Sequence, residues 1–162
     1  MTLKKINKSD LEDIYKREKR YLVKAVEDGK SPYHLFTLST INDDSPELRI
    51  VVLRKVNINP FKLSFNSDIR SPKAYQLKNN KYCNVLFYDS IRRIQMRFKC
   101  LITINHKNNI SQEVWNQTAL QSRKCYMGPH SPTSILEAWH PNLPIDCIER
   151  DPSEEESQSG YK

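Results

Sequence analysis

A hydroxyl, a proline and a cation occur together at Ser71-Pro72-Lys73, between two apolar segments that have the character of β-strands. Proline is favoured in the first turn of a helix, so this motif predicts that a helix begins here. The amides and the dipole of a helix N-terminus attract anions, and a lysine and a hydroxyl beside them would add donors. This combination of groups suits a phosphate.

Three arginines lie close to this motif in the sequence. Arg49 and Arg54 bracket an apolar strand-like segment, and Arg70 directly precedes Ser71. Guanidinium groups donate paired hydrogen bonds to phosphate oxygens. The cluster therefore predicts a phosphorylated ligand on a β scaffold, although Arg49, Arg54 or Arg97 taken alone is better explained as a strand-surface charge.

The pattern of apolar residues predicts the elements that would position these groups. A capping box at Ser9-Asp10-Leu11-Glu12 and a stop at Gly29 bound an amphipathic helix. A short helix is expected over 71–79 and a second amphipathic helix over 110–127. Alternating apolar and polar residues predict five strands, at residues 34–40, 49–56, 63–66, 84–88 and 94–104. Five antiparallel strands with flanking helices favour a mainly β fold that forms a small barrel.

Composition limits the function classes. The 162 residues are expected to form one domain over 1–148, followed by an acidic segment, 149–162, whose composition is typical of disorder. The chain has a net charge of +7, but the aromatic residues are not interleaved with the basic ones, so we expect no nucleic-acid binding. We find no secretory signal, no apolar run long enough to span a membrane and no metal-ligand spacing among the four cysteines. These features predict a cytoplasmic protein with no membrane partner.

The motifs between Tyr33 and Met127, taken in order, resemble those of the pyridoxamine 5'-phosphate oxidase-like family of FMN-binding split barrels. The branch most similar to this chain contains an FMN-binding domain of uncharacterised activity. The motifs that carry the resemblance are Arg49-x-Val51-x-Leu53-Arg54, Phe65-Asn66, Arg70-Ser71-Pro72-Lys73, Asn79-Asn80, Leu86-Phe87-Tyr88, Arg93-Ile94-Gln95-Met96-Arg97 and Ser122-Arg123-x-x-Tyr126.

The resemblance implies a split β-barrel of the antiparallel Greek-key type that binds FMN without a covalent bond as a homodimer. Lys73, with Arg70 and Ser71, would hold the FMN phosphate. Arg54 and Arg123 would face the substrate, a small molecule that the resemblance does not identify. The other implied cofactor contacts are Arg49, Ile50, Val51, Val52, Leu53 and Arg54 along the ribityl and phosphate, Phe65 and Asn66 beside the isoalloxazine ring, and Gln95 to the flavin.

The implied activity is that of an FMN-dependent oxidoreductase. Two alternatives stay open: a non-catalytic flavin- or haem-binding module, and a true pyridoxamine 5'-phosphate oxidase. Family members continue with one or two further strands that carry a basic motif, and this sequence stops at Lys162, about where they are expected to begin. We therefore expect the last barrel strands to be missing from this sequence.

Overall fold

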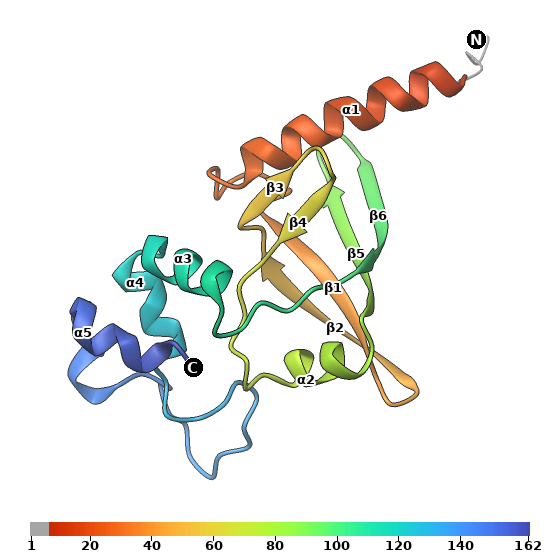
Figure 1. The fold of residues 1–162 in the computed structure, drawn as a ribbon. Helices are drawn as coiled ribbons and strands as arrows, with labels where there is room; N and C mark the ends of the chain where they lie inside the picture. Colours follow the sequence, from red (N-terminus) through yellow and green to blue (C-terminus); the bar gives the residue numbers. More distant parts are fainter. Residues whose placement is uncertain (1–6) are drawn as a thin grey trace. The chain divides into compact units, whose positions relative to one another are not determined.

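The structure, a computed structural model, describes residues 7–162. Its contacts divide the chain into two compact units. The sheet unit comprises residues 7–66 together with Tyr82–Cys100, and the helical unit comprises Ser67–Lys81 together with Leu101–Lys162. Figure 1 labels the α-helices and the strands.

The sheet unit contains an antiparallel four-stranded sheet in the order β2-β1-β5-β6. β1 pairs antiparallel with β2 on one side and with β5 on the other. Two short strands, β3 and β4, form a second antiparallel sheet, and among the described residues no strand pairing joins the two sheets into a closed barrel. The strands are β1 (Leu35–Asn42), β2 (Ser45–Val52), β3 (Lys55–Asn57), β4 (Lys62–Ser64), β5 (Tyr82–Asp89) and β6 (Ile94–Leu101).

The predicted strand over 49–56 is two strands in the structure. β2 ends at Val52, and β3 begins at Lys55 in the other sheet. At this junction the backbone N–H of Leu53 donates to the carbonyl of His34 at 2.8 Å, whereas that of Arg54 donates to the carbonyl of Ser64 at 2.8 Å. The chain therefore changes hydrogen-bonding partner within two residues, which the alternation pattern alone does not reveal.

One face of the sheet carries the core of this unit. Phe36 and Leu38 of β1 and Phe87 of β5 are buried, and their neighbours along each strand are more exposed, as expected for side chains of period two. The Phe87 ring lies 5.7 Å from that of Tyr33 and 5.0 Å from that of Phe36. This aromatic cluster fixes the strand register, because a one-residue slip would move it to the opposite face.

Helix α1 (Lys8–Ala25) belongs to the same unit, where it contacts β3. The predicted amphipathic helix is present, and its buried residues include Leu22 and Ala25, whereas Leu11 and Tyr21, which have the same helical spacing, are exposed. The predicted cap was wrong by two residues: Asn7 is the N-cap, with its side chain accepting from the Asp10 amide and its own amide donating to the Asp10 carboxylate. The helix also ends before Gly29, with Val26 as its C-cap.

The helical unit consists of short helices joined by irregular segments. The predicted helix over 110–127 is interrupted, because Thr118 and Ala119 adopt extended backbone angles (ψ 128° and 143°). The Thr118 carbonyl released by this break accepts a hydrogen bond from Arg123 Nε at 2.8 Å. The helices are α2 (Pro72–Asn79), α3 (Asn109–Gln117), α4 (Leu120–Arg123), η1 (Lys124–Tyr126), η2 (Ile145–Cys147), α5 (Glu154–Ser157) and η3 (Gln158–Gly160).

The acidic segment 149–162 differs from the expectation of a disordered tail, because α5 and η3 lie within it. Ser153 closes a capping box with Glu156 at the start of α5. Ser157 and Gly160 are buried in the helical unit. The boundary at 148 that the sequence suggests between a barrel domain and a tail stays a prediction.

Candidate functional site

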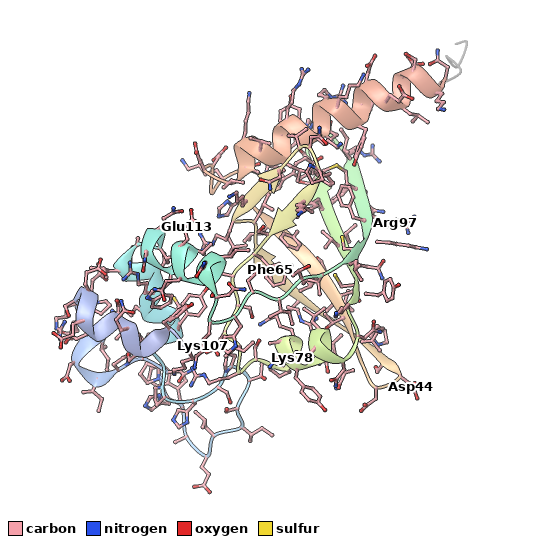
Figure 2. All side chains as sticks on the ribbon, in the orientation of Figure 1. Asp44, Phe65, Lys78, Arg97, Lys107 and Glu113 are labelled. Atoms are coloured by element: carbon pink, nitrogen blue, oxygen red, sulfur yellow. The ribbon has the colours of Figure 1, made fainter. Side chains whose placement is uncertain are left out.

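The residues predicted to bind the cofactor occur in both units. Arg70, Ser71, Lys73 and Arg123 belong to the helical unit, and the others belong to the sheet unit. The side chains of both units are drawn in Figure 2.

A lysine and two hydroxyl groups meet at the start of α2. Lys73 Nζ donates to Ser67 Oγ at 3.1 Å, and Ser67 Oγ lies 3.1 Å from Ser71 Oγ. The Ser71 hydroxyl in turn donates to the carbonyl of Asp68 at 2.7 Å. We call Ser67, Ser71 and Lys73 the α2 hydroxyl cluster. Two of its members were predicted from the sequence, and Ser67 was not.

Local sequence explains the geometry of this cluster. Pro72 occupies the first turn of α2 and holds the preceding Ser71 in an extended conformation (φ −72°, ψ 147°). The Ser71 side chain makes no capping hydrogen bond, and the first turn of α2, all of whose residues the structure describes, has no acidic residue. Ala74 and Leu77 are buried and anchor the helix. The positive end of the helix dipole is therefore not neutralised by a carboxylate of its own first turn.

Arg70 makes contacts within the helical unit that hold the loop before α2. Its Nη2 lies 2.7 Å from Asp68 Oδ2 and donates to the Gly128 carbonyl at 3.0 Å, and its Nη1 donates to the Pro129 carbonyl at 3.4 Å. Burial raises the pKa of Asp68, but the hydrogen bonds from Arg70 outweigh it and hold that pKa below its usual range. The carboxylate beside the α2 hydroxyl cluster is thus charged and paired, and the phosphate contact predicted for Arg70 stays a prediction.

Arg49 lies on β2 and is also held by neighbouring groups. Its Nη2 is 3.0 Å from Glu47 Oε2, and its Nη1 donates to the Glu47 carbonyl at 3.2 Å and to the Thr40 hydroxyl. Glu47 and Arg49 are two residues apart on a strand and share a face, which explains their pairing. Arg54, in contrast, is exposed after β2 ends.

The strand residues between these arginines alternate in burial. Val51 and Leu53 are buried in the core, whereas Ile50 is 62% exposed. Because β2 is an edge strand of its sheet, one side of its backbone is not paired with β1. Phe65 lies after β4 and packs edge to face on Phe36, with ring centroids 6.0 Å apart. The remaining two residues of this predicted group, Val52 and Asn66, are partly buried.

Gln95 and Arg123 have opposite environments. Gln95 is exposed on β6, on the same strand face as Arg97, which is labelled in Figure 2. Arg123 is 2% exposed and contacts Glu154 at 2.5 Å, Ser157 Oγ at 3.1 Å and the Asn116 carbonyl at 3.1 Å. These contacts hold Arg123 within the helical unit without a ligand, so its substrate contact stays a prediction.

The described residues contain no group of three or more histidine, cysteine or carboxylate side chains arranged to hold a metal ion. Among the described helices, none combines the length and the apolar character that crossing a membrane requires.

Comparison with known proteins decides the family. The model of the family described as pyridoxamine 5'-phosphate oxidase, FMN-binding domain, matches residues 16–106, which is more than half of the chain. The chain belongs to this family. The match contains every residue of the α2 hydroxyl cluster and of the predicted cofactor site, whereas Arg123 lies beyond it.

Solved structures agree on the fold. A pyridoxamine 5'-phosphate oxidase-related, FMN-binding protein from Nostoc punctiforme aligns with a TM-score of 0.63 and 20% identity, over 80% of this chain and 71% of that one. PhzG from Burkholderia lata, solved with tetrahydrophenazine-1-carboxylic acid, aligns with a TM-score of 0.61 and 14% identity, over 76% of this chain and 60% of that one. A search of curated proteins found no match. The antiparallel sheet with flanking helices is therefore the split-barrel fold of the FMN-binding family.

Proposed function

We propose that this member of the FMN-binding family binds FMN and uses it as an oxidoreductase, with the α2 hydroxyl cluster holding the phosphate. The observation that carries the proposal is the contact of Lys73 Nζ with Ser67 Oγ at 3.1 Å, beside Ser71 and at the start of a helix. This cluster lies within the segment that matches the family.

The donor set fits a phosphate dianion. The Lys73 ammonium group and the exposed Ser67 hydroxyl can donate to phosphate oxygens, and hydrogen bonds from the ammonium group are charge-assisted and stronger than neutral ones. The buried Ser71 hydroxyl donates its proton to the Asp68 carbonyl and holds the loop beside them. The nearby Asp68 carboxylate would repel the anion, but it is paired with Arg70 at 2.7 Å. Arg70 therefore supports the site by neutralising Asp68, whether or not it also reaches the phosphate.

The other predicted residues keep their proposed roles. Arg49 and the strand that follows it would line the ribityl chain, Phe65 and Asn66 would lie beside the ring, and Gln95 would contact the flavin of a homodimer. When bound, FMN supplies hydride and electron transfer, and the protein binds and orients it. Of the two proposed substrate contacts, we favour Arg54 because it is exposed, whereas Arg123 is buried and fully engaged in internal contacts.

The phosphate assignment predicts a difference between FMN and riboflavin, which lacks the phosphate. Lys73→Ala should weaken FMN binding by about 10- to 100-fold, as expected for a charge-assisted hydrogen bond of roughly 1.5–3 kcal/mol, and leave riboflavin binding unchanged. Lys78→Ala, at the last turn of the same helix and labelled in Figure 2, is the matched control because it changes the same net charge. Titrations followed by flavin fluorescence measure both ligands.

The phosphate assignment fails if Lys73→Ala, like the control Lys78→Ala, leaves the ratio of FMN affinity to riboflavin affinity unchanged from that of the natural chain. The redox activity is tested separately, by anaerobic reduction of the bound flavin with NADH, NADPH or pyridoxine 5'-phosphate. Reduction by a nicotinamide supports a general oxidoreductase. Reduction by pyridoxine 5'-phosphate alone indicates a pyridoxamine 5'-phosphate oxidase, and no reduction by any of them indicates a non-catalytic flavin-binding module.

A further inference from the structure

Two cysteines of the sheet unit face each other on adjacent strands. Cys83 lies on β5 and Cys100 on β6, which are neighbours in an antiparallel hairpin. The backbone N–H of Ile102 donates to the carbonyl of Lys81 at 2.9 Å, and two residues further along each strand this register places Cys83 opposite Cys100. Side chains of directly opposed residues project from the same face of a sheet.

The two thiols differ in exposure. Neither is in a disulfide. Cys83 is 6% exposed, whereas Cys100 is only partly buried. The neighbouring Cys83 thiol lowers the pKa of Cys100 to about 7, despite the opposing effect of burial. The interaction with Cys100, together with burial, raises the pKa of Cys83. At neutral pH Cys100 is therefore partly the thiolate, whereas Cys83 is the thiol.

This asymmetry is what a reactive dithiol requires. The thiolate is the nucleophilic form of cysteine, so the partly exposed Cys100 is the attacking group. Opposed residues of an antiparallel pair have Cα atoms about 4.5–5.5 Å apart, and disulfides span about 4.4–6.8 Å. Cys83 can therefore form a disulfide with Cys100 without a large movement of either strand.

We propose that Cys83 and Cys100 form a peroxide-reactive dithiol. The Cys100 thiolate attacks one oxygen of hydrogen peroxide, the O–O bond breaks, and the departing hydroxide takes a proton to become water, which leaves Cys100 as a sulfenic acid. The Cys83 thiol then attacks the Cys100 sulfur, an S–S bond forms, and the hydroxyl of the sulfenic acid leaves with the Cys83 proton as a second water. The two thiols are oxidised by two electrons, and the peroxide is reduced to two water molecules.

The position of the dithiol indicates what its oxidation would do. β5 begins at Tyr82 and β6 ends at Leu101, so Cys83 and Cys100 each lie one residue inside the end of the hairpin. A disulfide between them would close this end of the hairpin covalently, and a dithiol reductant would reverse the bond.

The test uses the full chain without added cofactor. The protein is treated with hydrogen peroxide, its remaining thiols are blocked with N-ethylmaleimide, and intact mass and peptide mapping locate the change. We expect the loss of two hydrogen atoms, a peptide that links Cys83 to Cys100, and full reversal by dithiothreitol. The rate should be half-maximal near pH 7, below the value of about 8.5 for an ordinary thiol such as glutathione measured in parallel.

Two variants separate this proposal from general oxidation. Cys83→Ala should stop at a Cys100 sulfenic acid that dimedone traps, and Cys125→Ser, which removes an exposed thiol, should form the disulfide at the natural rate. The proposal is overturned if Cys125 reacts before Cys100, or if Cys100 gains oxygen atoms without a cross-link to Cys83. If Cys83→Ala does not fold, peptide mapping of the natural chain still decides between these outcomes.

Discussion

Glu18 is a buried carboxylate whose replacement by glutamine should destabilise the sheet unit strongly. It is 1% exposed on α1 and accepts hydrogen bonds from Tyr33 Oη at 2.8 Å, Arg92 Nη1 at 2.8 Å and Arg17 Nε at 3.0 Å. Burial raises the pKa of Glu18, but these three donors outweigh it and the net pKa is lowered. The carboxylate is therefore charged in the folded protein, and all of its nearest polar partners are donors.

The size of the effect follows from what the glutamine can still do. Its single carbonyl oxygen can accept from one or two of the donors, but its NH₂ group would face the remaining one, donor to donor. Breaking a buried ion pair costs roughly 3–5 kcal/mol. Arg92 also contacts Asp89, with Nε 2.6 Å from Oδ2, so it is not left unpaired. We therefore expect Glu18→Gln to lower the free energy of unfolding by about 2–4 kcal/mol, somewhat less than the cost of leaving a buried charge without any partner.

Urea denaturation followed by far-UV circular dichroism measures this change. With a slope of roughly 1–3 kcal/mol per molar urea, a loss of about 3 kcal/mol lowers the midpoint by about 1–3 M. Glu12→Gln is the matched control, because it makes the same chemical change at an exposed position of the same helix. A Glu18→Gln midpoint that equals the Glu12→Gln midpoint would refute the argument that the buried network stabilises the fold.

Three further outcomes are expected. Stability should be level at about pH 5–6, below the range in which Cys100 titrates. It should fall below about pH 4, because the pKa of Glu18 is lower in the folded protein than in the unfolded chain, so acid protonates the unfolded chain first. It should also fall above about pH 10, because the pKa of Tyr33 is raised in the folded protein, so base ionises the unfolded chain first. Urea midpoints measured across pH test both limits. Arg123→Met should cost about 2–3 kcal/mol by urea titration, since it leaves buried carbonyls without donors. Gly160→Ala should cost about 1–3 kcal/mol, read by tryptophan fluorescence, because the added Cβ would lie 2.9 Å from the Trp115 ring.

Local pattern predicted the elements whose causes are local. Alternation along residues 34–40 and 84–88 predicted strands that the structure contains as β1 and β5, and apolar spacing predicted the helix α1. The break at Thr118 could not be predicted in this way, because no proline or glycine marks it. It is associated with the Arg123 hydrogen bond to the Thr118 carbonyl, and Arg123 is itself held by Glu154, which lies 31 residues further along the chain.

In the candidate site, too, features with local causes could be predicted from the sequence and long-range contacts could not. The motif Ser71-Pro72-Lys73 predicted the start of α2, since proline acts on its own neighbours. Ser67 could have been proposed from its position four residues before Ser71, but only the folded loop brings its hydroxyl to Lys73. The contact of Arg70 with the Gly128 carbonyl joins positions 58 residues apart, and no local signal indicates it.

Three of the predicted site arginines are paired with carboxylates of the protein, so the basic composition overstates the number of groups available to bind an anion. Arg49 is paired with Glu47, Arg70 with Asp68 and Arg123 with Glu154. A guanidinium presents the same fork of donors to a carboxylate as to a phosphate, so sequence motifs do not distinguish the two partners. Replacing Arg70 would release the Asp68 carboxylate and the loop before α2 along with any ligand contact. Replacing Lys73 is therefore the sharper test of the phosphate site. Comparing the FMN and riboflavin affinities of the Lys73 and Lys78 variants separates loss of the anion contact from loss of the fold.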